Sequence, residues 1–496
     1  MQTPGEDGAI AESPSEARTA AAAYPAADET GRLRGGRLRF FRTLAESVGV
    51  QGPTAGVVIA PAVLASVSGG GTALVQLVAA VAMGFVAYAF VVFTRGFNSA
   101  GSVYGFTGAV AGPLFGFISA WTLMLAYASF AGATYAVTAA IAQSAFGAVG
   151  LHLSWQVYAI IVFVLVMAFA CSDIKISATV ILALEGASML LVVTACSIVL
   201  ARGGFHGHAF SSVPFQPDGA TLSVLGLGIV FTFSTFAGFE ASATLGEESQ
   251  QPQRLIPPAI MASLAVVAVF TIGVTAVVTN AYPSIHQLST ATVPLVTVTD
   301  RFVAGWMGDL VNFSAVFSAF GAALACAVGA SRILFALGRD AGPVVLRRTS
   351  RITGAPVGAL IWVGAGSLLT LLLFIKEPLA TRAVTIVATY ASDLIIAAYI
   401  LVVAAAIIFT IRRRMAPIKT AVLVIGLAIL GYIVKDTFVP FPAPPYSWDA
   451  LAAGITLLAG VVLPFACPPL RCGIRDSPLL KAGASALLGS GCVNDQ

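Results

Sequence analysis

The stretch VGVQGPTAGVVIA at residues 48–60 places glycine and proline in the middle of an apolar segment long enough to cross a membrane. A second apolar segment carries STFAGFE at residues 234–240, again near its middle. Proline removes a backbone donor and clashes with the preceding helical turn, whereas glycine permits dihedral angles closed to other residues. Non-helical backbone at membrane depth is tolerated only where protein or a water-filled cavity satisfies its polar groups. Both segments are therefore predicted to be broken transmembrane helices.

The composition is that of a polytopic membrane protein. Of the 496 residues, 58% are hydrophobic and 10% are charged, against about 25% charged residues in an ordinary soluble domain. So few charges cannot cover a globule of this size, which excludes a soluble enzyme and a disordered or coiled-coil chain. The basic residues lie beside apolar runs rather than in a patch with interleaved aromatic residues, so we expect no nucleic-acid partner.

The sequence carries no motif for a cofactor or a catalytic centre. It lacks a phosphate-binding loop, an HExxH helix and a nucleophile elbow, and none of its six cysteines forms a CxxC pair. We therefore expect no enzyme activity, no cofactor, no metal site and no disulfide framework.

We predict about twelve transmembrane helices, because a spanning helix needs about 20 mostly apolar residues. Their approximate ranges are 44–66, 73–94, 113–142, 154–171, 176–200, 221–246, 257–280, 308–338, 356–375, 382–410, 418–438 and 449–470. The chain then divides into a disordered N-terminal tail, acidic and then basic (1–43), a first repeat (44–200), a second repeat (221–410), two further helices (418–470) and a C-terminal tail (471–496).

The distribution of Lys and Arg predicts that both termini are cytoplasmic. With the N-terminus inside, 21 of the 26 basic residues fall in inside loops and tails and five in outside loops, as the positive-inside rule requires. We expect a multi-pass protein of the cell membrane, surrounded by the lipid bilayer. The basic stretch from Arg32 to Arg42 is expected to anchor this topology and can contact anionic headgroups.

The two predicted breaks lie in the first and sixth spans. Because five spans separate them and five is odd, helices 1–5 and 6–10 run in opposite senses. Interrupted helices at matching positions of two halves predict an inverted-repeat transporter with a substrate site near the bilayer midplane. The alternative is tight helix packing through small residues, which glycine and alanine also serve in membranes.

Ionisable residues inside the spans are candidates for function. Glu185 lies about 14 Å into the fifth helix at 1.5 Å per residue, Asp393 lies near the middle of the tenth, and Glu240 follows the break in the sixth. A carboxylate at this depth is costly to leave charged. The three are therefore candidate proton-coupling groups, with Glu185 first, Asp393 as its rival and sodium as the rival coupling ion.

Glu247 and Glu248 end the sixth helix at the predicted cytoplasmic face. The helix dipole disfavours anions at this end. We expect the two carboxylates to pair with a loop cation such as Arg254 or Arg95, in a structural or gate role.

Three blocks of sequence resemble the signature of the amino acid–polyamine–organocation permeases. The first block is Gly238-Phe239-Glu240-Ala241 with Glu247-Glu248, Pro252, Arg254 and Ile256-Pro257. The second is Ala100-Gly101-Ser102-x-Tyr104 with Gly112-Pro113 and Trp121, and the third runs from Ser331-Arg332 to Arg339-Asp340, with Pro356 beyond it. The blocks lie in register over about residues 44–410.

The resemblance implies an all-α LeuT-like fold of 5+5 inverted repeats plus two extra helices. It also implies that the substrate carboxylate sits on backbone amides at the first break, in agreement with the attraction of a helix N-terminus for anions. The substrate ammonium would meet carbonyl groups released at both breaks. The residues carried over as substrate-binding are Gly52, Thr54, Ala55, Gly56, Phe236, Ala237 and Gly238, with Phe236 closing over the substrate as an aromatic gate. Pro53 departs from the family's glycine–small–glycine pattern and removes one amide donor.

The expected function is secondary transport of amino acids or related small organic amines by alternating access, with proton coupling or exchange. The alternatives are a polyamine or ethanolamine-type permease, a non-transporting membrane nutrient sensor, and a channel. The short acidic tail argues against a sensor, and a single inverted pair of broken helices argues against a symmetric channel filter. No charged residue is clearly placed to receive a charged substrate side chain, so the sequence favours a neutral or small amine substrate.

Overall fold

The computed structural model describes residues 33–147, 150–206, 211–216, 232–377, 380–444 and 446–489. Within these ranges the regular secondary structure is helical, apart from an isolated bridge between Leu38 and Ser249, and turns and loops join the helices. The α-helices are α1 (Phe40–Gln51), α2 (Pro53–Val57), α3 (Ala60–Ser68), α4 (Thr72–Thr94), α5 (Val103–Ala111), α6 (Pro113–Gly147), α7 (Trp155–Ala170), α8 (Ile174–Ala201), α10 (Pro252–Ala281), α11 (Ile285–Ser289), α12 (Pro294–Phe302), α13 (Gly305–Asp340), α14 (Val357–Leu373), α15 (Ala380–Arg412), α16 (Pro417–Phe438), α17 (Tyr446–Ala466), α18 (Pro468–Arg475) and α19 (Pro478–Leu488). Short 3-10 helices are η3 (Gly204–His206), η4 (Val213–Phe215) and η5 (Ala241–Leu245).

Eleven of the twelve predicted spans coincide with apolar helices. Eight helices are long and apolar enough to cross a membrane, namely α4, α6, α8, α10, α13, α15, α16 and α17. The first span is bent, with α1 and α2 followed by α3, and α7 and α14 are shorter apolar helices of 16 and 17 residues. The predicted sixth span (221–246) begins outside the described residues, which resume at Thr232.

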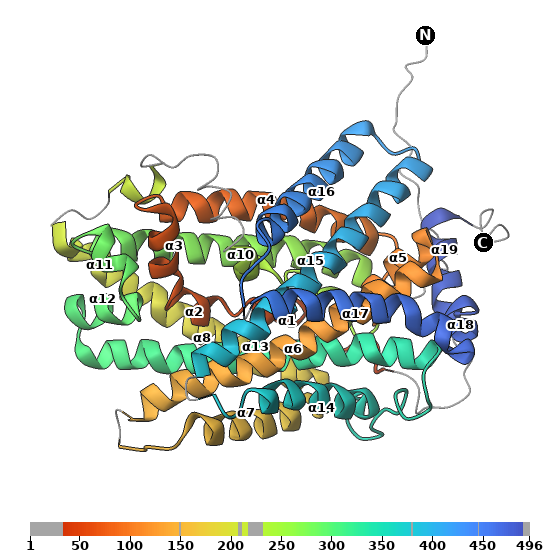
Figure 1. The fold of residues 1–496 in the computed structure, drawn as a ribbon, viewed down its shortest axis with the longest axis horizontal. Helices are drawn as coiled ribbons and strands as arrows, with labels where there is room; N and C mark the ends of the chain where they lie inside the picture. The colour runs from red at the N-terminus through yellow and green to blue at the C-terminus, as the bar shows by residue number, and fades with distance from the viewer. Residues whose placement is uncertain are drawn as a thin grey trace, which may run out of the picture.

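The bundle is built around two long central helices, α6 and α13, which pack along each other (Figure 1). The apolar window of α13 is 78% buried, whereas those of α16 and α17 are each 22% buried. The last two spans therefore lie at the periphery, as expected for helices added outside a 5+5 core. α7 and α14 lie together along the edge opposite α16 (Figure 1).

The shorter helices gather at the two ends of the bundle. α3, α11 and α12 lie at one end, and α5, α18 and α19 lie at the other (Figure 1). α11 and α12 belong to a predicted outside loop, whereas α5 belongs to a predicted inside loop. The two ends thus match the predicted sidedness of the loops, and the orientation in a membrane stays a prediction.

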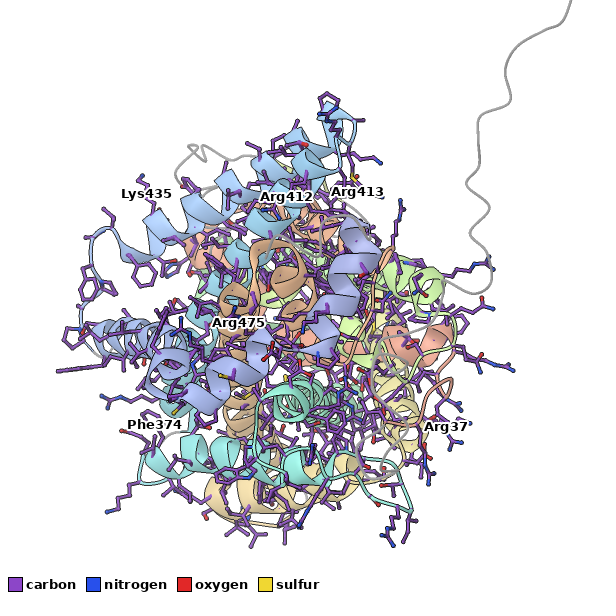
Figure 2. All side chains as sticks on the ribbon, turned by 90° about the vertical axis from the view of Figure 1, so that its right-hand side faces the viewer. Arg37, Phe374, Arg412, Arg413, Lys435 and Arg475 are labelled. Carbon is purple, nitrogen blue, oxygen red and sulfur yellow. The ribbon has the colours of Figure 1, made fainter. Side chains whose placement is uncertain are left out.

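Both predicted tails contribute packed residues at the end that carries α5. Leu479, Leu480 and Leu487 of α19 are buried, and α19 contacts α5. In the N-terminal segment Leu38 is buried and Arg37 donates to Asp173 (2.6 Å). Residues 1–32 of the predicted N-terminal tail lie outside the described residues. Figure 2 looks onto this end and labels Arg37, Arg412, Arg413 and Arg475.

Asp173 joins the N-terminal segment to the start of α8. Its side chain accepts from the backbone N–H of Lys175 and caps the helix. Although partial burial opposes the charge, this hydrogen bond and the Arg37 guanidinium hold the pKa of Asp173 below its usual value. The contact therefore favours the charged form at neutral pH.

Candidate functional site

The first break has two parts. Gly52 ends α1 in the left-handed region (φ 50°, ψ 51°), and Pro53 then begins α2, a position that needs no backbone donor. The larger change of direction, 72°, falls at Val58 and Ile59 between α2 and α3. The predicted break in the QGPTAG stretch is therefore present at Gly52, but the sharpest bend lies just beyond it.

The backbone amides of α2 already have acceptors within the protein. The donor–acceptor pairs are Thr54 N–H to Glu185 Oε1 (3.3 Å), Ala55 N–H to Ser318 Oγ (3.1 Å) and Gly56 N–H to the Gly52 carbonyl (3.1 Å). The hydroxyl groups of Thr54 and Ser318 lie near the Glu185 carboxylate, although within the described residues neither the Thr54 hydroxyl nor Glu185 Oε2 has a hydrogen-bond partner. In this structure Glu185 stands where the family resemblance puts the carboxylate of the substrate.

Glu185 reaches the break because α8 packs against both α1 and α13. Its side chain is 2% exposed. Among the described residues Glu185 forms no ion pair; the Thr54 amide is its hydrogen-bond partner at Oε1, and Oε2 has none. A carboxylate held only by neutral donors is suited to taking up a proton.

The second break, in the sixth span, lies against the end of α1 beside the first break. The chain leaves a helical turn after Phe236, and Gly238 adopts φ 101°. A side chain at Gly238 would collide with Val50 of α1, so this position requires glycine for its dihedral angles and for the close approach. Phe236 and Ala237 are 0% and 4% exposed. The second break is therefore closed to solvent at these residues in this conformation.

Glu240 is held by two tyrosines from different helices. Tyr127 of α6 donates to Oε1 of Glu240 (2.5 Å), and Tyr399 of α15 donates to Oε2. Tyr399 also accepts from the N–H of Gly238 (3.1 Å). The two hydroxyl groups thus tie the sixth span to α6 and α15, while a coupling role for Glu240 stays a prediction.

The carboxylates at the end of the sixth span have different partners from those predicted. Glu248 pairs with Arg332 (Nε to Oε2, 3.1 Å), and Glu247 pairs with Arg339 (Nη2 to Oε1, 2.7 Å). The expected partners Arg254 and Arg95 are both exposed, and neither forms an ion pair within the described residues. The expectation of a loop cation was wrong, because α13 brings two arginines from far along the chain to this point.

The sequence profile of the amino acid permease family matches residues 38–461 of the chain. This chain belongs to the amino acid permease family. The branched-chain amino acid permease BcaP of Bacillus subtilis is 26% identical to this permease over 294 residues, which cover 55% of this chain and 61% of that protein. The chloroplastic cationic amino acid transporter 9 of Arabidopsis thaliana is 30% identical over 188 residues, covering 38% and 32% respectively. Each matched stretch spans less than two thirds of the relative's length.

The fold of this permease is also that of a solved transporter. A crystal structure of a manganese transporter from Eremococcus coleocola superposes with a TM-score of 0.50 at 11% sequence identity. The match covers 90% of this chain and 99% of that chain. The all-α, LeuT-like fold predicted for this permease is confirmed.

The three signature blocks of the permease meet in one place. Glu247 of the first block pairs with Arg339 of the third and accepts from the backbone N–H of Ala100, in the second (3.1 Å). A side chain at Gly246 would come within 2.8 Å of the Ser99 backbone nitrogen. The signature residues of this permease therefore fasten the end of the sixth span to α13 and to the segment before α5.

Sequence reasoning missed Glu46 of the permease. This α1 side chain is fully buried, and neither carboxylate oxygen has a hydrogen-bond partner among the described residues. It lies within electrostatic reach of Arg332 and Glu248. Glu46 lies only two residues inside the predicted first span, and the sequence carries no local signal that the helix turns it inward.

Asp393 forms no hydrogen bond or ion pair with either break in the described part of the chain. It belongs to α15 and is 9% exposed. Its carboxyl group lies within electrostatic reach of Asp449 at the start of the peripheral helix α17. The structure therefore brings Glu185 and not Asp393 to the first break, and a coupling role for Asp393 stays a prediction.

Proposed function

We propose that this permease is a secondary active transporter of amino acids or related small organic amines, working by alternating access with a proton carried on Glu185. The observation behind the proposal is the contact of the Glu185 carboxylate with the Thr54 amide. This amide lies at the turn where the family resemblance puts the substrate carboxylate.

Competition for this amide would couple proton and substrate. Two charged carboxylates at one donor repel each other, so one of them must be neutral or absent. A proton on Glu185 removes its charge and releases the Thr54 amide to the substrate, while the hydroxyl groups of Thr54 and Ser318 can accept from the neutral carboxyl group. Substrate and proton would then load together, because each raises the affinity for the other.

A neutral amino acid is the proposed substrate. The side chains of Val50, Phe236 and Ala237 at the meeting of the two breaks are apolar, and the charged groups nearby are held by other residues of the protein. An apolar substrate side chain would bury apolar surface here without leaving a charge unpaired. The printed name of the Bacillus subtilis relative, a branched-chain amino acid permease, agrees with this choice.

A small organic amine without a carboxylate is the second candidate. The engagement of the Thr54 amide by Glu185 favours it, because such a ligand would need no free amide and its ammonium could pair with Glu185 directly. Uptake into proteoliposomes of labelled leucine and of isopentylamine, which is leucine without its carboxyl group, separates the two. Accumulation of leucine supports the first proposal, accumulation of the amine alone supports the second, and the absence of any flux would favour a sensor.

Filling the space beside the first break should weaken substrate binding. Gly56 is exposed, and no atom lies within 4 Å of the position its Cβ would take, so Gly56→Leu fits the folded protein. We expect the affinity for leucine to fall at least tenfold, because the added side chain takes the space that the ligand needs. Scintillation proximity binding in detergent measures the affinity.

Gly186→Leu is the matched control for this substitution. Gly186 lies next to Glu185 in α8, is exposed, and also has no atom within 4 Å of the position its Cβ would take. We expect the Gly186→Leu variant to bind leucine like the wild type. Gly238→Leu is unsuitable, since its positive φ and the contact with Val50 would strain the fold. Wild-type affinity in Gly56→Leu would place the substrate site elsewhere.

We also propose that the protein lies in the cell membrane with both termini in the cytoplasm. Leu151 and Ile352 are 48% and 86% exposed in loops on opposite predicted sides. In a background without the six native cysteines, Leu151→Cys should react with an impermeant maleimide from outside and Ile352→Cys only after permeabilisation. Reaction of both cysteines from the same side of intact cells would contradict the topology.

A further inference from the structure

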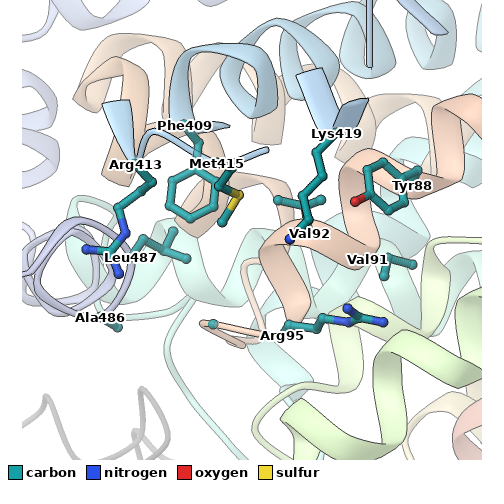
Figure 3. Close-up of a pocket in the computed structure, with 11 residues that line it drawn as sticks. Tyr88, Val91, Val92, Arg95, Phe409, Arg413, Met415, Lys419, Ala486 and Leu487 are labelled. Atoms are coloured by element: carbon teal, nitrogen blue, oxygen red, sulfur yellow. The ribbon is translucent and has the colours of Figure 1, made fainter. Parts of the chain in front are cut away.

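A cavity of about 250 Å³ opens where α4, α15 and α19 end and α16 begins. Three cationic side chains line it, those of Arg95, Arg413 and Lys419. Figure 3 shows Arg413 and Lys419 on either side of Met415, with Arg95 below them. The cavity lies at the end of the bundle that carries α5 and α19, which is the predicted cytoplasmic end.

Within the part of the chain that the structure describes, no acidic side chain compensates the charge of this cavity. Among the described residues, Arg95, Arg413 and Lys419 form no ion pair. Three like charges around one cavity repel each other at short range. An anion between them would relieve this repulsion and accept hydrogen bonds from guanidinium and ammonium groups, as phosphate oxygens do.

An apolar groove continues from this cavity along the outside of the bundle. It has a volume of about 460 Å³ and shares Tyr88 and Lys419 with the charged cavity. Val81, Met261 and Ile418, from three different helices, are 56%, 41% and 69% exposed in it. From Arg95 in the cavity to Val81 in the groove, the two together follow α4 for about 21 Å at 1.5 Å per residue, so the groove extends well into the hydrocarbon of one leaflet.

We infer that the cavity and the groove together form a binding site for an anionic glycerophospholipid of the cytoplasmic leaflet. The phosphate of the headgroup lies among Arg95, Arg413 and Lys419, and one acyl chain lies in the groove between α4, α10 and α16. Charge complementarity selects the headgroup, and the apolar groove beside it selects a lipid over a free phosphate. The ligand joins α4 and α10 to α15 and α16, which are distant in sequence.

Binding is measured by native mass spectrometry of the detergent-purified protein with three probes: phosphatidylglycerol, phosphatidylcholine and glycerol 3-phosphate. We expect phosphatidylglycerol to bind at least tenfold more tightly than phosphatidylcholine, which has no net charge. Glycerol 3-phosphate, which has the phosphate without acyl chains, should show no binding at the same concentration. Equal binding of the two lipids, or binding of glycerol 3-phosphate as tight as that of phosphatidylglycerol, would overturn the inference.

The charged part of the site is tested by changing Arg95, Arg413 and Lys419 together to glutamine. We expect the affinity for phosphatidylglycerol to fall at least tenfold. The control changes Arg347, Arg348 and Arg475 to glutamine, which removes the same charge from exposed positions outside the cavity. An equal loss of affinity in both triple variants would mean that net charge, and not this site, attracts the lipid.

The groove is tested separately by Gly84→Leu. Gly84 lines the groove, and no atom lies within 4 Å of the position its Cβ would take, so leucine fills the groove without displacing the helix. We expect phosphatidylglycerol binding to fall at least fivefold, whereas Gly431→Leu, at an equally open position of α16 outside the groove, leaves it unchanged. Unchanged lipid binding in Gly84→Leu would remove the acyl chain from the groove.

Discussion

Replacing Arg332 with alanine is expected to lower the free energy of unfolding by about 3–5 kcal/mol, the cost of breaking a buried ion pair from one side. The Arg332 guanidinium holds Glu248 by two hydrogen bonds of 3.1 and 3.3 Å, and the two side chains are 1% and 2% exposed. Without the cation, Glu248 and the neighbouring Glu46 remain buried with no positive partner. The fraction of monodisperse protein left after heating in detergent, measured by size-exclusion chromatography, checks the prediction.

The exposed pair of Arg382 and Glu377 provides the control. Their atoms lie 3.7 Å apart and their side chains are 64% and 29% exposed, so Arg382→Ala should change stability by about 0–1 kcal/mol. Combining Arg332→Met with Glu248→Met should recover part of the loss, since both charges are then removed. If Arg332→Ala and Arg382→Ala lose stability equally, the buried pair does not fasten the sixth span to α13.

The spans and the breaks could be predicted because the signals for both are local. About 20 consecutive apolar residues specify a membrane helix without reference to other parts of the chain. Gly52 and Gly238 mark the breaks because glycine adopts a positive φ more readily than residues with a side chain. The bend at Val58 and Ile59 contains no glycine, and its local signal is Pro61 in the first turn of α3, which cannot donate to the preceding helical turn.

The partners of buried charges could not be predicted because they depend on tertiary contacts. Glu247 and Glu248 lie 92 and 84 residues from Arg339 and Arg332, whereas the cations close to them in sequence are exposed. A residue's depth in a span also says little about which face of the helix it occupies. Glu46 and Glu185 both point into the bundle, and only the packing of α1, α8 and α13 shows which of them reaches the break.

Glu185→Gln is expected to abolish substrate accumulation driven by a pH gradient while keeping substrate exchange. Glutamine has the same shape and its amide oxygen can still accept from the Thr54 N–H, which the glutamate accepts at 3.3 Å, but it cannot carry a proton. With one proton per substrate, the wild type can accumulate leucine up to about tenfold for each unit of pH gradient, because one unit is worth about 1.4 kcal/mol. The variant should reach a ratio of about one. Counterflow in proteoliposomes, which needs no net proton movement, measures the exchange that remains.

The pH dependence of binding gives a second test of the same residue. In the wild type, leucine affinity should fall as the pH rises, because a charged Glu185 competes with the substrate carboxylate for the Thr54 amide. In Glu185→Gln this competition between charges is gone, so affinity should be nearly independent of pH. Asp393→Asn is the control for the residue, since Asp393 lies near Asp449 and has no contact with the Thr54 amide. Replacing sodium with choline is the control for the coupling ion and should have no effect on wild-type uptake. Full gradient-driven accumulation in Glu185→Gln together with its loss in Asp393→Asn would move the proton site to α15.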